Sequence, residues 1–174
     1  MAVFARPVWP DFVNAEITPL KGAVSMKKTG YIYTIVEDKE FQTRIFNAEF
    51  ENEWMRLKID GSLLVKGSHY KGYAWNGCSP KIQFLDTAIG TPEGVLNPDT
   101  LVSKTYYPSL VHDVFYQFSF HYKNRIKRGD VDQEFYRMLK AEHFKAADIY
   151  YGAVRFLGSF FWGRQKQASI ARKL

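Results

Sequence analysis

The sequence predicts an α+β domain with antiparallel β-hairpins first, then a long loop, then about three helices packed on the sheet. Residues 29–75 contain short runs that alternate between apolar and polar side chains, as strands do. Residues 76–104 hold six glycines and prolines, which interrupt regular structure. The later residues carry apolar side chains at helical spacing. No linker divides the chain, so residues 1–174 are expected to form a single domain.

Two hairpins are expected in the first half of the chain. Residues 29–36 and 41–46 would be the strands of the first hairpin, joined by the polar turn between them. Residues 54–65 would form the second, because Asp60-Gly61 is a dipeptide typical of tight two-residue turns. A further strand is expected within residues 69–75. The sheet would therefore be mostly antiparallel.

Three helices are expected after the loop. Pro108 suits the first turn of the first helix, because that turn needs no backbone N–H donor. Asp130 is placed to cap the second helix. The apolar face of this second helix would consist of Phe135, Met138 and Leu139.

The third helix is expected over residues 146–162, with two adjacent apolar stripes. Such a wide apolar face indicates a deeply buried helix, so Val154, Leu157 and Phe161 are predicted to be core residues. The alternative is a helix that lies on a membrane surface, because a basic tail, residues 164–174, follows it. The helix has few charged residues of its own, which favours burial.

The composition restricts the class of protein. Aromatic residues make up 17% of the chain and supply large apolar side chains for a core. Cys78 is the single cysteine, so no disulfide can form within the chain and a reducing cytoplasm is expected. The first residues lack the layout of a signal peptide. No apolar run reaches the roughly 18 residues of a membrane span, so none is expected.

Positive charge is concentrated in the second half of the chain. The net charge is +6, and residues 88–174 carry +5 of it, with 13 basic and 8 acidic side chains. The excess lies in residues 123–128 and in the basic tail. Such clusters attract phosphate groups, so nucleic acid and anionic lipid headgroups are candidate partners. The alternative is that both segments are ordinary solvated surface.

The pair His112-Asp113 lies near the start of the first expected helix, directly after the irregular loop. Histidine can serve as a general base or metal ligand, and aspartate can orient it or bind metal. The pair is therefore a candidate catalytic or metal-binding site. The alternative is a structural hydrogen bond or a helix cap, because adjacent residues on a helix do not face the same way.

Trp75, Asn76 and Ser79 fall at the end of the last expected strand. An aromatic ring, a side-chain amide and a hydroxyl beside a flexible glycine are typical of a loop that contacts a ligand. These three residues are therefore candidate substrate contacts. A turn that uses Asn76 and Ser79 only for local hydrogen bonds explains the same residues. Cys78 has no demonstrable histidine partner, so a role as nucleophile is not expected.

Arg128 and Asp132 stand four residues apart at the start of the second expected helix. This spacing favours a salt bridge along the helix. The alternative is a hydrolase site, in which Asp132 joins His112 and Asp113 as catalytic residues or as ligands of a divalent metal. Arg128 would then contact the substrate.

Four segments follow one another along the chain: GYAWNGCSP, YPSLVHDVFY, RGDVDQEFYRML and YYGAVRFLG. In this order they resemble the phage and prophage protein family known as domain of unknown function 1353. The matching residues are Ser79-Pro80, His112-Asp113, Arg128 with Asp132 and Phe135, and Ala153-Val154-Arg155 with Gly158. The resemblance covers roughly residues 60–160. Where that family usually has an aspartate, this chain has Asn76, which would weaken a metal site or a base at that position.

Two classes of function are therefore expected. The resemblance implies a phage- or prophage-encoded accessory or virion-associated protein that acts by binding, in the host cytoplasm or in the virion. Its partner would be a phage or host protein. The residues themselves allow a small hydrolase built from loop 76–80, His112, Asp113 and Asp132. No complete catalytic motif is present, which favours the binding protein.

Overall fold

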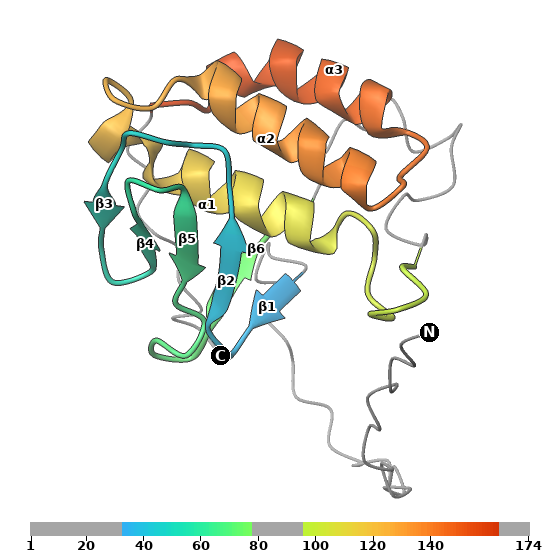
Figure 1. The fold of residues 1–174 in the computed structure, drawn as a ribbon, viewed down its shortest axis with the longest axis horizontal. Coiled ribbons are helices and arrows are strands. Elements are labelled where there is room, and N and C mark those ends of the chain that lie inside the picture. The colour runs from blue at the N-terminus through green and yellow to red at the C-terminus, as the bar shows by residue number, and fades with distance from the viewer. Residues whose placement is uncertain (1–32, 78–95, 164–174) are drawn as a thin grey trace, which may run out of the picture.

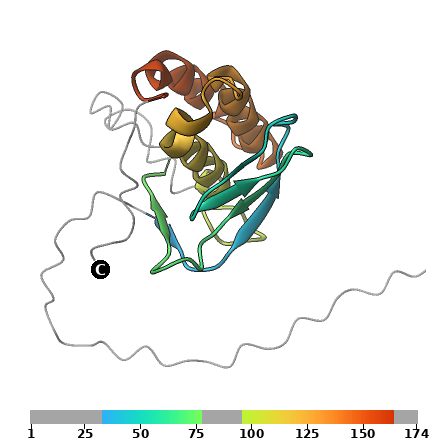
Figure 2. The ribbon, with the colours of Figure 1, turned by 90° about the vertical axis from the view of Figure 1, so that its left-hand side faces the viewer.

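The computed structural model describes residues 33–77 and 96–163 and places a layer of strands against a layer of three helices (Figure 1). The strands come first in the chain and the helices last, so the predicted α+β class is confirmed. From the sheet outward, the helices are stacked in the order α1, α2, α3 (Figure 2). Ser79, Cys78 and the basic tail lie outside the described residues.

Six short strands form two sheets. They are β1 (Tyr33–Ile35), β2 (Lys39–Gln42), β3 (Phe50–Glu51), β4 (Met55–Leu57), β5 (Ser62–Val65) and β6 (Tyr73–Trp75). Strands β2, β5, β4 and β3, in that order, form a four-stranded antiparallel sheet. Strands β1 and β6 form a separate antiparallel pair.

The second predicted hairpin is confirmed by β4 and β5, which pair with Met55 opposite Val65. Ile59, Asp60 and Gly61 form the turn between them, and the backbone N–H of Lys58 donates to the backbone oxygen of Ser62 across it. Gly61 has a φ angle of +84°, and a Cβ atom there would collide with the carbonyl oxygen of Thr43. The turn therefore requires glycine both for its backbone conformation and for the close approach of a neighbouring segment.

The first predicted hairpin is wrong, because β1 and β2 do not pair with each other. Instead, β1 pairs with β6, where Tyr33 lies opposite Trp75, and β2 pairs with β5. The residues between β1 and β2 cross from one sheet to the other. Asp38 holds this crossing by accepting hydrogen bonds from the backbone N–H and the hydroxyl of Ser68. Alternation along a segment identifies a strand but not its partner.

The helices are α1 (Tyr106–Tyr122), α2 (Arg128–Ala141) and α3 (Ala147–Leu157), and the short 3-10 helix η2 (Gly158–Phe160) continues α3. Pro108 lies in the first turn of α1, as predicted. Asp130 lies inside the first turn of α2 and is not its cap, because the helix begins at Arg128, three residues earlier than expected, and Lys127 is the residue at the cap position. Its negative charge still favours the N-terminal end of the helix. No helix in the described part of the chain is both long and apolar enough to cross a bilayer.

The main core lies between the sheet and α1. Inward side chains of β4 and β5 meet those of α1 there, and the buried residues include Met55, Leu57, Leu63, Val65, Leu110, Val114 and Phe115. A smaller buried cluster joins α2 to α3 and consists of Phe135, Leu139, Phe144 and Ala147. Because this second cluster is small, α3 is attached to the rest of the protein by few buried apolar side chains.

The predicted deep burial of the third helix is wrong. Val154 and Leu157 are only partly buried, and Phe161 is 46% exposed. Ala147 is the one buried residue of α3. The reason is the position of α3, which is the outermost helix and packs on α2 with one of its two stripes (Figure 1). An apolar pattern shows which faces are apolar but not whether another segment covers them.

Truncating a side chain in the buried cluster between α2 and α3 should reduce stability more than truncating one on the exposed face of α3. Leu139→Ala opens a cavity in the cluster between α2 and α3, so we expect it to lower the free energy of unfolding by about 2–5 kcal/mol. Phe156→Ala removes an exposed ring and should change it by less than about 0.5 kcal/mol. Urea denaturation of both variants measures the difference. Similar losses for the two would contradict this assignment of inner and outer faces.

Candidate functional site

The strongest candidate site surrounds the carboxylate of Asp132, which is completely buried on α2. Two groups from α1 approach its Oδ1 atom: Nε2 of His112 lies at 3.3 Å, and the hydroxyl of Tyr116 donates a hydrogen bond of 2.5 Å. Two guanidinium groups approach Oδ2: that of Arg155 on α3 at 3.0 Å and that of Arg128 on α2 at 3.5 Å. One carboxylate therefore bridges all three helices.

Helical spacing explains much of this cluster. His112 and Tyr116 are four residues apart on α1, and Arg128 and Asp132 are four residues apart on α2, so each pair shares one face of its helix. The predicted salt bridge between Arg128 and Asp132 is confirmed at 3.5 Å. The predicted convergence of His112 and Asp132 is also confirmed, since their side chains are in contact.

The His112 ring lies between two carboxylates. Its Nε2 atom faces Asp132, and its Nδ1 atom is 3.7 Å from Oδ1 of Asp113. The ring also packs against the rings of Tyr116 and Phe135, at centroid distances of 4.2 and 4.8 Å. As a result His112 is held from several directions and is only 8% exposed.

Asp113 connects the cluster to the end of strand β6. Its side chain is 30% exposed, and its Oδ2 atom accepts a hydrogen bond of 3.3 Å from the backbone N–H of Asn76. Asn76 is itself exposed. The predicted grouping of Asn76 with the histidine and the two aspartates is therefore present, whereas Ser79 lies outside the described residues. Asp113 and Asn76 form the solvent-facing side of the cluster.

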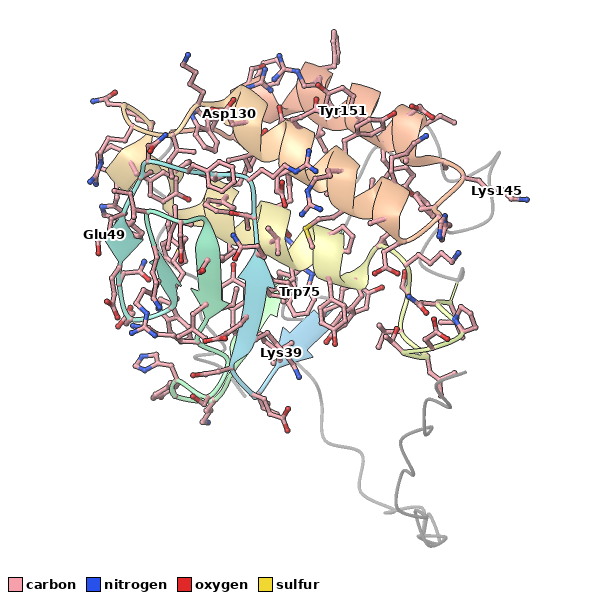
Figure 3. All side chains as sticks on the ribbon, in the orientation of Figure 1. Lys39, Glu49, Trp75, Asp130, Lys145 and Tyr151 are labelled. Atoms are coloured by element: carbon pink, nitrogen blue, oxygen red, sulfur yellow. The ribbon has the colours of Figure 1, made fainter. Side chains whose placement is uncertain are left out.

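Trp75 and Arg128 are not placed as substrate contacts. The indole of Trp75 is buried beneath α1 (Figure 3), and its Nε1–H donates to the hydroxyl of Ser109 at 3.0 Å. The guanidinium of Arg128 donates to the backbone oxygens of Val154 and Arg155 at 3.3 and 3.0 Å, in addition to facing Asp132. Both side chains use their polar groups within the chain, so they hold structural elements together instead of facing a ligand.

The cluster also contains Tyr116 and Arg155, which the sequence patterns did not predict as site residues. The position of Tyr116 four residues after His112 was a usable signal, because that spacing places both on one helix face. Arg155 reaches Asp132 only through the packing of α3 on α2, which no local pattern encodes. Gly158 belongs with them, because a Cβ atom at this position would collide with the Tyr116 hydroxyl.

The electrostatics of the cluster are those of a buried ion pair. Burial opposes the charge on His112, but the hydrogen bonds and charges of Asp113 and Asp132 outweigh it, so the pKa of His112 is raised. Burial also opposes the charge on Asp132, but its contacts with His112, Tyr116 and Arg155 lower its pKa. Burial, followed by the neighbouring carboxylate, raises the pKa of Tyr116. Tyr116 is therefore a neutral donor to a charged acceptor.

The cluster suits proton handling better than metal binding. The two carboxylates face opposite nitrogens of one ring, so His112, Asp113 and Asp132 do not converge on a single point. Within residues 33–77 and 96–163, no three histidine, cysteine, aspartate or glutamate side chains form a group that could hold a metal ion. A divalent metal therefore does not fit the expected ligands in this arrangement. A histidine between two carboxylates can hold or transfer a proton.

Comparisons with protein-family models, with curated proteins and with solved structures gave no match. The fold and the site by themselves define an α+β protein whose helical layer contains a buried cluster of histidine, aspartate, tyrosine and arginine. Function must therefore be inferred from this geometry and from the exposed surface around it.

The hydrogen bond from Tyr116 to Asp132 should stabilise the helical layer. Tyr116→Phe removes one donor to a buried charge, so we expect the free energy of unfolding to fall by about 1.5–3 kcal/mol. Tyr151→Phe is the matched control, because the Tyr151 hydroxyl donates to Gln133 on the exposed surface. Chemical denaturation compares the two variants. A loss no larger than that of the control would show that the cluster contributes little to stability.

The raised pKa of His112 makes stability depend on pH. Its folded-state pKa lies above the ordinary value of 6.5, so its contribution is complete below that value and is lost as pH rises through the folded-state pKa. The free energy of unfolding should therefore decrease from mildly acidic towards alkaline pH, and His112→Gln should remove this part of the slope. Urea denaturation over a pH series tests this. Identical slopes in the two proteins would contradict it.

Proposed function

We propose that this chain is a phage- or prophage-encoded accessory or virion-associated protein that acts by binding, in the host cytoplasm or in the virion. The observation that carries the proposal is a contrast between two regions. The groups around Asp132 satisfy one another within the chain, whereas the outer face of α3 presents large apolar side chains to solvent. Exposed apolar surface of this kind marks sites of interaction more often than sites of chemistry.

The phage source is supported by the four segments that resemble domain of unknown function 1353. Each of them supplies at least one member of the cluster: Asn76, His112 and Asp113, Arg128 and Asp132, and Arg155. Segments far apart in sequence thus meet at one place. Their common location explains why the four segments would occur together in one type of domain, and it implies no particular reaction.

Binding is favoured over chemistry because the cluster offers little to a substrate. Asp132 is completely buried and His112 nearly so, which leaves Asp113 as the accessible acidic group. A general base must come within hydrogen-bond reach of its substrate, directly or through one water molecule. The buried groups are placed instead to hold α1, α2 and α3 together. Removing one partner of such a buried pair is strongly destabilising.

A small hydrolase is the second candidate, and one observation favours it. Asp132 contacts one nitrogen of His112, while the other nitrogen faces Asp113 near the exposed end of strand β6. A histidine oriented by a buried carboxylate is the arrangement of a general base. In this alternative His112 would move a proton, Asp132 would orient its ring, and Asp113 with Asn76 would contact the substrate.

His112→Ala separates the binding protein from a metal-dependent hydrolase. In the binding protein, the substitution leaves the buried Asp132 without one partner and should cost about 1–3 kcal/mol. The wild type should then give no heat when titrated with zinc, manganese or magnesium. In a hydrolase that used His112 as a metal ligand, in place of the general-base role above, the wild type would bind a metal and His112→Ala would abolish that binding.

Isothermal titration calorimetry and thermal melts measure both properties. His121→Ala, at an exposed position of the same helix, is the matched control. A heat of metal binding that disappears in His112→Ala and persists in His121→Ala would overturn the proposal of binding without chemistry.

A further inference from the structure

The outer face of α3 and η2 carries a stripe of three large apolar side chains, here called the outer stripe. Ile149, Phe156 and Phe160 are 53%, 78% and 57% exposed. Spacings of seven and four residues place them along one side of the helix axis. Gly152 lies between them, and apart from its chain neighbours and the backbone of its own helix no atom of the described residues lies within 4 Å of the place where its Cβ would be. The stripe is therefore an open, continuous apolar surface.

A second feature, the basic turn of residues 123–128 between α1 and α2, lies beside one end of this stripe. A Cβ atom on Gly163 would be 3.0 Å from Cδ of Lys123, so the lysine covers the chain just after η2. The Arg128 guanidinium donates to the backbone oxygen of Arg155 near the end of α3. Figures 1 and 3 show the start of α2, marked by Asp130, at the same end of the helical layer as the end of α3.

The edge of the molecule formed by the basic turn and the end of α3 carries a positive charge. Lys123, Arg125 and Lys127 are exposed. Two exposed acidic residues lie near them: Asp130, and Glu49, whose backbone oxygen accepts a hydrogen bond from Arg125. Arg128 and Arg155 already face Asp132 and do not add to this charge.

We propose that the outer stripe and the basic turn form a docking surface for an anionic lipid bilayer. The proposal rests on the binding function above and names what is bound. Phenylalanine rings can enter the boundary between headgroups and acyl chains, while lysine and arginine remain beside the phosphates. Each basic residue near an anionic surface strengthens binding roughly fivefold. The basic turn and the outer stripe would therefore both contribute to binding the same bilayer.

The size of the stripe argues against a second copy of the chain as the occupant. Three partly exposed side chains of this kind offer apolar area on the order of 400 Å². A stable interface between proteins buries about 800 Å² on each partner. The positive charge of the basic turn would also be repelled by the same turn of an identical copy brought close to it. A bilayer needs neither a matching shape nor the larger area.

Sedimentation of the full chain with lipid vesicles tests the proposal. The wild type should bind vesicles of phosphatidylcholine with phosphatidylglycerol and bind pure phosphatidylcholine much more weakly. Added salt should reduce binding, because it screens the attraction to the headgroups. The double variant Phe156→Gln with Phe160→Gln should lower the partition coefficient at least tenfold. Ile59→Gln, at an exposed apolar position on the β4–β5 turn, is the matched control and should leave it unchanged.

The electrostatic contribution has its own pair of variants. Lys127→Glu should reduce binding to the anionic vesicles by about fivefold or more. Lys58→Glu makes the same charge change at an exposed position on the sheet and should have little effect. Thermal melts establish that all variants remain folded.

Failure of the wild type to bind the anionic vesicles would overturn the proposal, as would equal binding by the double phenylalanine variant. Light scattering that shows a dimer, dissolved by the same double variant, would identify a second copy as the occupant and would also overturn it. None of these results changes the outcome of the metal titration. A heat of metal binding would contradict the proposed function, in which the protein binds without catalysing a reaction. It would not change the interpretation of the vesicle experiment.

Discussion

The buried carboxylate of Asp132 determines how the three helices are arranged. An ionised carboxylate leaves water at a large cost unless other donors replace the lost hydration. Here the donors come from His112 and Tyr116 on α1 and from Arg155 on α3. The cost is therefore offset only when all three helices are assembled. Apolar contacts allow helices to slide, whereas hydrogen bonds are directional, so the cluster sets their register.

Several other features follow from this cluster. Gly158 leaves the space that the Tyr116 hydroxyl occupies beside η2. Arg128 faces Asp132 and also donates to the backbone oxygens of Val154 and Arg155 near the end of α3. Polar contacts and one small apolar cluster are enough to attach α3 along a single side. Its second apolar stripe consequently remains on the surface, where a partner can reach it.

The two proposals for function give the cluster different roles. In a binding protein it makes a rigid platform that presents the outer face of α3. In a hydrolase it orients His112 towards Asp113 at the exposed strand end. The two roles differ in how accessible the carboxylates must be to a ligand. Asp113 is partly exposed and a ligand can approach it, whereas Asp132 is buried. A continuous series of contacts joins Asn76 to Arg155, so the end of strand β6 and the outermost helix share one polar network.

The sequence alone determined the features that depend on local spacing: the α+β class, the tight turn at Asp60-Gly61, and the shared face of Arg128 and Asp132. It also pointed to His112 and Asp132 as one site. The tertiary structure decided which segments meet. Strand β1 pairs with the distant β6, Arg155 reaches Asp132 from a separate helix, and α3 lies outermost. Local alternation and helical period are the same whether a face is covered or open, because burial depends on residues far away in the chain.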